Sequence, residues 1–294
     1  MVTQEKPLAG RAAIITGANR GLGLAIAEAF IKAGASVMLC ARDKEALDRA
    51  GAELVRHAGD GQAVRWRAAD VTDAGAIDDL VAEALGEFGR LEVLVNNAGV
   101  YGPFGLIEDV DWEDWAQAIA INLFGSVIPV RAVLPHFKKQ RYGKIIQLSG
   151  GGATNPLPRI SAYAASKAAI VRFAETVAEE CKGLGIDVNS VAPGPLNTRL
   201  LDDVLTAGPE KVGKDFFARA MRQKEEGGVA FGVAAELIVF LASAASDGIT
   251  GRLISAVWDD WRGWASHLAE LNESDVFTLR RITARDRGFD WGDK

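Results

Sequence analysis

The sequence has little that would hold a protein together covalently or through a metal. It contains only two cysteines, Cys40 and Cys181, which lie in apolar stretches far apart in the chain. We interpret both as buried free thiols rather than a disulfide, as is usual in a reducing compartment. The three histidines, His57, His136 and His267, lack the spacing of metal ligands, so the sequence predicts no metal site.

Long apolar runs and an excess of positive charge are missing as well. We expect no stretch to be long and apolar enough to span a membrane, and the first residues carry no apolar signal core. We therefore expect a cytoplasmic protein with no membrane partner. The net charge of −6 argues against a nucleic-acid partner. The 294 residues, 49% hydrophobic and 24% charged, are typical of a globular protein that buries its own core.

Short apolar stretches alternate with longer helical ones along most of the chain. Strands are expected at 12–16, 37–40, 64–68, 91–95, 144–148, 187–191 and 253–257. The clearest helices are expected at 22–33, 43–57 and 74–88. This alternation predicts an α/β protein with a doubly wound Rossmann fold, in which a seven-stranded, mostly parallel sheet carries helices on both faces. Ligands should bind at the carboxyl ends of the strands.

We expect a single domain, residues 1–256, followed by a C-terminal extension, residues 257–294, that packs on the domain or on a neighbouring subunit. Within the domain, residues 199–228 are charged and punctuated by glycine, and we interpret them as a mobile flap. We expect Trp258, Trp261 and Trp264 in the extension to form core or subunit contacts rather than to recognise substrate, and Trp112 and Trp115, ahead of Asn122, to pack as well.

A glycine-rich turn joins the first expected strand to the first helix. It reads Thr16-Gly17-Ala18-Asn19-Arg20-Gly21-Leu22-Gly23. Glycines there permit a tight turn and let the backbone approach a pyrophosphate, whose charge suits a helix N-terminus. Because the turn lies within a strand–helix–strand unit, it predicts a dinucleotide site.

The end of the second expected strand bears on which dinucleotide binds. NAD-binding folds usually carry an acidic residue about 20 residues beyond the turn, to bind the ribose. Here the strand ends in Ala41-Arg42 without one, and Asp43 is expected to point away from Arg42. Arg42 and Arg20 are suited to a 2′-phosphate. We favour NADP(H), with NAD(H) as the alternative; the competing interpretation is two solvated surface arginines.

Several short motifs follow one another in a fixed order, and with them the chain resembles the classical short-chain dehydrogenase/reductase family over residues 8–256. The motifs are Thr16–Gly23, Asp70-Val71, Asn96-Asn97-Ala98-Gly99, Asn122, Tyr163-Ala164-Ala165-Ser166-Lys167, and Pro193-Gly194 with Thr198. The resemblance implies an NAD(P)-dependent oxidoreductase that interconverts a small-molecule carbonyl and a secondary alcohol. It also implies a homodimer or homotetramer.

The resemblance assigns cofactor contacts by position. The adenine would lie against Asp70 and Val71, the body of the cofactor against Asn97, Ala98 and Gly99, and the nicotinamide against Pro193, Gly194 and Thr198. Lys167 would bind the nicotinamide ribose, and Asn122 would hold a water that links this lysine to solvent.

Tyr163 and Lys167 are the expected acid–base pair. They lie four residues apart in a helical stretch, so their side chains emerge from one face. A free tyrosine has a pKa of about 10, and a nearby ammonium favours the phenolate. The phenol can then give its proton to a carbonyl oxygen as hydride arrives at the carbon.

One family residue is missing. The serine that polarises the substrate oxygen usually stands thirteen residues before the tyrosine, and that position is Gly150 here. We predict that Ser149 takes the place of this serine, with Thr154 as the alternative residue. A third possibility is that the protein is a poor reductase. This possibility motivates a competing hypothesis, in which the protein is a cofactor-binding scaffold or sensor with little catalysis. An epimerase or dehydratase with retained cofactor is a further one.

Overall fold

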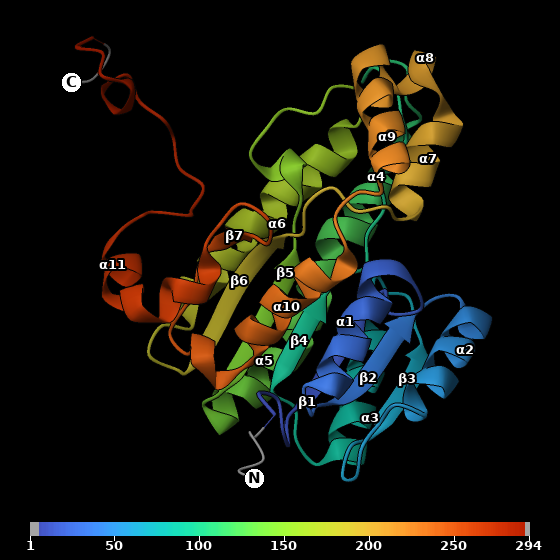
Figure 1. Ribbon diagram of the computed structural model, residues 1–294, viewed down its shortest axis with the longest axis vertical. Coiled ribbons are helices and arrows are strands. Elements are labelled where there is room, and N and C mark those ends of the chain that lie inside the picture. The colour runs from blue at the N-terminus through green and yellow to red at the C-terminus, as the bar shows by residue number, and fades with distance from the viewer. Residues whose placement is uncertain (1–5, 292–294) are drawn as a thin grey trace.

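The computed structural model describes residues 6–291, and a parallel sheet forms its centre (Figure 1). The strands are β1 (Ala12–Thr16), β2 (Ser36–Ala41), β3 (Val64–Ala68), β4 (Val93–Asn96), β5 (Gly143–Leu148), β6 (Ile186–Ala192) and β7 (Leu253–Ser255). Their order is β3-β2-β1-β4-β5-β6-β7, and every neighbouring pair is parallel. The predicted doubly wound Rossmann fold is confirmed, with a sheet that is parallel throughout.

Helices cover both faces of the sheet, which is why its central strands are almost continuously apolar. One face carries α1 (Gly21–Lys32), α2 (Lys44–Val55) and α10 (Phe231–Ala242). The other carries α3 (Ala74–Phe88), α5 (Gly125–Gln140) and α6 (Ser161–Glu180). The bounds of β3 and α3 are those predicted from the sequence.

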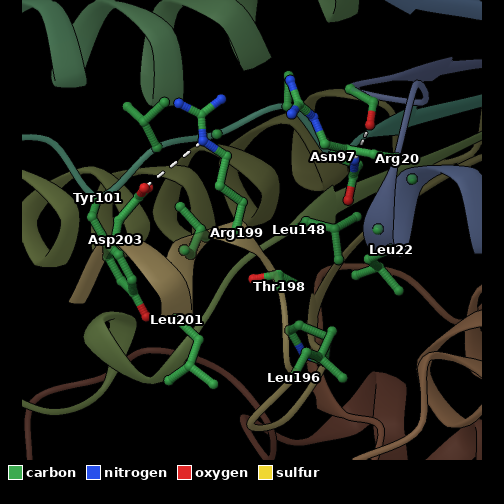
Figure 2. Close-up of a pocket in the computed structure, with 18 of the residues that line it drawn as sticks. Arg20, Leu22, Asn97, Tyr101, Leu148, Leu196, Thr198, Arg199, Leu201 and Asp203 are labelled. Atoms are coloured by element: carbon green, nitrogen blue, oxygen red, sulfur yellow. Dashed lines mark hydrogen bonds and ion pairs between the residues drawn. The ribbon is translucent and has the colours of Figure 1, made fainter. Parts of the chain in front are cut away.

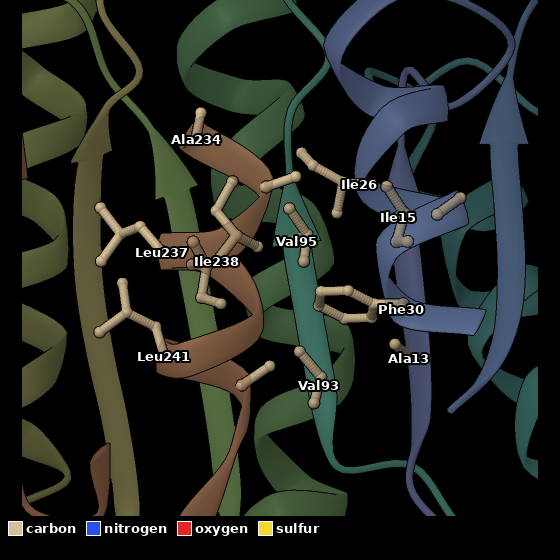
Figure 3. Packing of buried hydrophobic residues seen from close by; sticks show 14 of the residues in the cluster. Ala13, Ile15, Ile26, Phe30, Val93, Val95, Ala234, Leu237, Ile238 and Leu241 are labelled. Atoms are coloured by element: carbon tan, nitrogen blue, oxygen red, sulfur yellow. The ribbon is translucent and has the colours of Figure 1, made fainter. Parts of the chain in front are cut away.

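The packing of α1 and α10 fixes the start of α1 over the sheet. Ile26 and Phe30 of α1 are fully buried beside β1 and β4, and Leu237 and Ile238 of α10 are fully buried next to them, on the side toward β5 (Figure 3). Burying one such side chain contributes about 1.5–3 kcal/mol. The N-terminus of α1 is thereby held at the carboxyl end of β1.

The strand order reverses between β1 and β4, which opens a crevice at their carboxyl ends. Hydrogen bonds join the two strand ends there. The Thr16 hydroxyl oxygen accepts from the backbone N–H of Asn97 at 3.0 Å and of Ala98 at 3.1 Å. The glycine-rich turn and the Asn96–Gly99 motif therefore meet at the predicted ligand-binding edge.

The segment interpreted as a flap consists of three helices beyond the carboxyl ends of the strands (Figure 1). They are α7 (Arg199–Ala207), α8 (Pro209–Val212) and α9 (Lys214–Glu226). Gly208 and Gly213 have φ values of 77° and 88° and form the two junctions between them. The glycines thus mark helix boundaries that the sequence analysis did not predict.

A continuous helical run, made of α4 (Trp112–Ile119), the π-helix η1 (Ala120–Phe124) and α5, corrects one expectation. It is 29 residues long with a mean hydropathy of 1.6 over its most apolar window, long and apolar enough to cross a membrane. In this fold it packs against α3 and α6 as a helix of the core. Trp112 does not pack in the core of the chain: it is 70% exposed and stacks on Trp115, with the ring centroids 5.4 Å apart.

The chain after β7 packs on the domain that precedes it. It forms η4 (Trp261–His267), α11 (Leu268–Glu273) and η5 (Arg285–Arg287), while the short 3-10 turns η2 (Gly151–Ala153) and η3 (Ala244–Ser246) lie earlier. Trp261 and Trp264 are buried in the core cluster as predicted, whereas Trp258 is exposed. Beyond α11, Phe277 still bonds to β7 and Leu279 to Glu175 of α6, and the chain leads away from the body of the protein after them (Figure 1).

Candidate active site

A cleft of about 1180 Å³ lies at the carboxyl ends of the strands, between the glycine-rich turn and α7–α9 (Figure 2). Nearly all residues predicted for the site line it: Gly17, Asn19, Arg20, Gly21, Leu22, Gly23, Arg42, Val71, Asn97, Ala98, Gly99, Ser149, Tyr163, Lys167, Pro193, Gly194 and Thr198. Asp70 and Asn122 are the two that do not line it. Residues from distant parts of the chain thus form one continuous wall.

The glycine-rich turn has room for a phosphate because two of its glycines exclude side chains. Gly17 has a φ of +64°, and a Cβ on Gly23 would lie 2.2 Å from the Gly17 carbonyl oxygen. The Asn97 side-chain amide braces the turn by donating to the carbonyl oxygens of Thr16 and Gly17 at 3.0 and 3.1 Å. No side chain caps the N-terminus of α1. Its first N–H groups are therefore available to an anion such as a pyrophosphate.

Two arginines stand at the rim of the cleft. The side chains of Arg20 and Arg42 are 52% and 57% exposed. Arg20 lies 3.8 Å from the carboxylate of Asp43, and Arg42 lies 3.7 Å from that of Asp70. Such long, exposed ion pairs contribute little stability. Both guanidinium groups remain free to turn toward an anionic ligand.

The acidic partners of these arginines, Asp43 and Asp70, also accept hydrogen bonds that stabilise the local structure. Asp43 caps α2 by accepting from the N–H of Ala46 at 3.0 Å. Asp70 accepts from the N–H and the hydroxyl of Thr72 at 2.9 and 2.8 Å. Burial acts to raise the pKa of Asp70, but these hydrogen bonds and Arg42 outweigh it and keep the pKa below its usual value. Asp70 therefore carries a negative charge at neutral pH.

Asn122 stands behind the wall of the cleft and joins three elements. It is fully buried in η1, a π-helical turn of the kind often found at functional sites. Its Nδ2 donates to the Val100 carbonyl and to the Ser166 hydroxyl, both at 2.9 Å, and its Oδ1 accepts from the Val100 N–H at 2.8 Å. Asn122 thereby fixes the loop after β4 against the helix that carries Tyr163.

Tyr163 and Lys167 emerge from α6 into the cleft together. The Lys167 ammonium lies 5.6 Å from the centre of the Tyr163 ring and donates to the Leu148 carbonyl oxygen at 2.7 Å. Burial lowers the pKa of Lys167 to about 8. Burial, and next the neighbouring phenol of Tyr101, raise the pKa of Tyr163.

The direction of the Tyr163 shift differs from the sequence-based expectation. That expectation gave the decisive effect to the lysine charge, whereas in the structure desolvation of the phenol is larger. Tyr163 therefore keeps its proton at neutral pH. A neutral phenol is the form that can donate a proton to a carbonyl oxygen.

No serine or threonine in the described part of the chain bonds to the Tyr163 hydroxyl. Gly150 is its neighbour, because a Cβ there would lie 2.4 Å from Tyr163 Oη. Gly150 has an extended backbone, so the preceding Ser149 points to the opposite side. The Ser149 hydroxyl is buried without a hydrogen-bond partner. Thr154 is exposed and accepts from Asn155 at 3.0 Å.

Tyr101 also lines the cleft, and its part in the site was not predicted from the sequence. Its ring meets the ring of Tyr163 edge-on, with centroids 4.7 Å apart and an interplanar angle of 66°. The available signal was its position, two residues after Gly99 of the cofactor motif. That placement predicts a residue at the substrate end of the same loop.

Comparison with known proteins points to one family. The short chain dehydrogenase family model matches residues 11–207. The chain is 32% identical over 264 residues to D-β-hydroxybutyrate dehydrogenase of Cupriavidus necator, covering 88% of this chain and 99% of the relative. It is 34% identical over 252 residues to 3-oxoacyl-[acyl-carrier-protein] reductase of Thermotoga maritima, covering 84% and 96%.

Solved structures agree with this assignment. An actinorhodin polyketide ketoreductase variant with NADPH superposes with a TM-score of 0.75 at 27% identity, covering 83% of this chain and 95% of that one. An NAD⁺-bound xylitol dehydrogenase superposes with a TM-score of 0.76 at 26% identity, covering 85% and 98%.

Proposed function

Because this chain belongs to the short-chain dehydrogenase family and is an NAD(P)-dependent oxidoreductase that interconverts a carbonyl and an alcohol, we propose that Tyr163 is its general acid and base. One observation carries the proposal: Tyr163 and Lys167 lie in the same cleft as the glycine-rich turn. Lys167 assists the tyrosine, and Asn122 positions the helix that bears them both.

The residues of the cleft fit a nicotinamide dinucleotide. The turn from Gly17 to Gly23 and the N-terminus of α1 would hold the pyrophosphate, Val71 the adenine, and Pro193, Gly194 and Thr198 the nicotinamide end. Asp70 would contribute from beside Val71, and Asn97, Ala98 and Gly99 would line the middle. When bound, the nicotinamide ring supplies or accepts a hydride at the carbonyl carbon.

The chain itself moves the proton. In reduction, the Tyr163 hydroxyl gives its proton to the carbonyl oxygen as the new C–H bond forms, and in oxidation the phenolate takes the proton back. The phenolate left after reduction is stabilised by the charge of Lys167, 5.6 Å from the ring. Burial of both side chains keeps bulk water away, so that this charge interaction is weakly screened.

Replacing the phenol tests this assignment. Tyr163→Phe should lower kcat by on the order of 10²–10⁴ while leaving cofactor affinity unchanged. The first substrate panel follows the relatives' names and contains a 3-oxo acid, a 3-oxoacyl thioester and a polyol. Retention of wild-type turnover by Tyr163→Phe would disprove the assignment. Cofactor binding by the wild-type protein with no turnover on any ketone or alcohol would favour the scaffold hypothesis, which Gly150 motivates.

The cofactor preference is a separate proposal. Arg20 and Arg42 at the rim, with no acid in the place usual for NAD-binding folds, support NADP(H) over NAD(H). Calorimetry should give at least tenfold tighter binding of NADPH than of NADH, about 1.4 kcal/mol. Arg42→Ala should reduce this ratio without weakening NADH. Arg49→Ala, which removes an exposed arginine of α2, is the control, and tighter binding of NADH would overturn the preference.

We further propose a cytoplasmic homodimer or homotetramer. The helical run from α4 to α5 supports self-association, because it exposes Trp112 at 70% and Phe124 at 54%. Large apolar side chains exposed on one element often mark an interface. Light scattering after size-exclusion chromatography measures the assembly, and a monomer at micromolar concentration would refute it.

A further inference from the structure

Among the residues expected to act on the substrate oxygen, Tyr163 alone has a hydroxyl in place to reach it. Gly150 stands where the family's serine is expected. Ser149 also lines the cleft, but alternation along the extended chain directs its side chain away from the side of Gly150 that faces Tyr163. A Cβ on Gly150 would approach Tyr163 Oη to 2.4 Å, so the tyrosine hydroxyl occupies space that a serine side chain would need. A second donor to the substrate oxygen must therefore come from another wall of the cleft.

We propose that Tyr101 is this second donor, and that its phenol hydroxyl donates a hydrogen bond to the substrate carbonyl oxygen beside Tyr163. The proposal rests on the proposed function, since it concerns the same carbonyl. It adds a catalytic residue at a position for which the sequence motifs give no role.

Tyr101 is held in place by packing that leaves its hydroxyl unused. Its ring is wedged between Tyr163, 4.7 Å away, and Phe104, 5.9 Å away. It also packs on the cluster of Leu201 and Val204 from α7, and Figure 2 shows it in the same part of the pocket as Leu201 and Asp203. Within residues 6–291 the Tyr101 hydroxyl makes no hydrogen bond. A fixed ring with a free hydroxyl in a cleft suits recognition of one ligand oxygen.

The chemistry requires a neutral donor at this place. Negative charge develops on the carbonyl oxygen as hydride reaches the carbon, and a preorganised donor stabilises that charge. Burial, and next the nearby Asp203 carboxylate, raise the pKa of Tyr101, so its phenol stays neutral. Tyr163 transfers its proton to the oxygen, whereas Tyr101 shares a hydrogen bond and keeps its proton. The two phenols thus have different parts in one step.

The chain offers a matched set of variants, since it has three tyrosines. Tyr101→Phe keeps the ring packing and removes the hydroxyl, and we expect kcat to fall about 10–10³-fold at unchanged NADPH affinity and melting temperature. Tyr142→Phe is the control, because that hydroxyl binds Asp247 at 3.1 Å and lies outside the cleft. Ser149→Ala tests the alternative donor, and the inference requires a smaller loss of kcat there than in Tyr101→Phe.

The outcomes separate this inference from the proposed function. Wild-type kcat in Tyr101→Phe, or a larger loss of kcat in Ser149→Ala than in Tyr101→Phe, would overturn the role of Tyr101 and leave that of Tyr163 intact. Wild-type kcat in Tyr163→Phe would overturn the proposed function itself. If the loss of kcat in Tyr101→Phe came with a lower melting temperature and a weaker NADPH affinity, Tyr101 would be a packing residue. That result would also overturn the inference.

Discussion

The ammonium of Lys167 on α6 donates a 2.7 Å hydrogen bond to the carbonyl oxygen of Leu148, the last residue of β5. This bond ties the helix that carries Tyr163 to the carboxyl edge of the sheet. It also keeps a charged group almost fully buried, with 4% of the lysine exposed. The cost of that burial is visible in the pKa of Lys167, which desolvation lowers to about 8.

Lys167→Met should therefore stabilise the unliganded protein at pH 7 while abolishing activity. Below pH 8 the lysine is charged in both the folded and the unfolded chain, and the lowered pKa corresponds to a cost of about 3 kcal/mol. The variant also loses the hydrogen bond to Leu148, which reduces its gain in stability by about 1 kcal/mol. Between pH 8 and 10.5 the unfolded chain binds more protons, so wild-type stability rises with pH relative to the variant.

Urea unfolding of both proteins at pH 7 and pH 10 measures this difference. We expect the variant's advantage to shrink at the higher pH. Lys182→Met, which removes an exposed lysine, serves as the control and should show no such dependence. A variant that is less stable than wild type at pH 7 would contradict the prediction.

Gly23→Ala should damage the phosphate turn. The added Cβ would lie 2.2 Å from the Gly17 carbonyl oxygen and 2.5 Å from Asn97 Nδ2, so the turn must shift at a cost of about 1–3 kcal/mol. NADPH affinity, measured by calorimetry, should fall at least tenfold. Gly86→Ala in α3 meets nothing within 4 Å and should instead stabilise the protein by about 0.5–1 kcal/mol. Equal changes in NADPH affinity and in stability for the two variants would contradict this prediction.

Restoring the family's serine should not improve the enzyme. In Gly150→Ser the new Cβ comes within 2.4 Å of Tyr163 Oη, so the acid–base hydroxyl is displaced. We expect kcat to decrease about tenfold, because misplacing a proton donor weakens its contribution. Gly151→Ser meets nothing within 4 Å and is the control. An increase in kcat for Gly150→Ser would show that the site retains room for the usual serine.

Much of the fold could be predicted because local pattern and tertiary environment agree. The strand β3 and the helix α3 have their predicted bounds, because a short strand-forming stretch and an N-capped amphipathic helix are both local signals. The helices α7, α8 and α9 were missed because their limits depend on the φ values of Gly208 and Gly213, which the sequence does not reveal.

The positions of site residues could be predicted where a sequence motif fixes the backbone. They could not be predicted where contacts between distant parts of the chain determine the arrangement. Gly17, Asn97 and Lys167 lie where their motifs placed them, along one cleft. The arrangement at Gly150 depends on where the Tyr163 hydroxyl lies, which no spacing reveals. The role of desolvation in the pKa of Tyr163 likewise requires the packed structure, since Tyr101 and the surrounding core supply it.

The C-terminal extension should prove part of the domain's core rather than an appendage. Trp261 is 2% exposed, packs on Phe240 of α10 with centroids 5.4 Å apart, and has the Arg262 guanidinium 4.2 Å from its ring centre. Trp261→Ala should therefore lower the free energy of unfolding by about 3–5 kcal/mol. Trp258→Ala removes a tryptophan that is 73% exposed and should change it by less than about 0.5 kcal/mol. Urea unfolding of the two variants decides the matter, because similar small losses would mean that the extension rests on the domain without stabilising it.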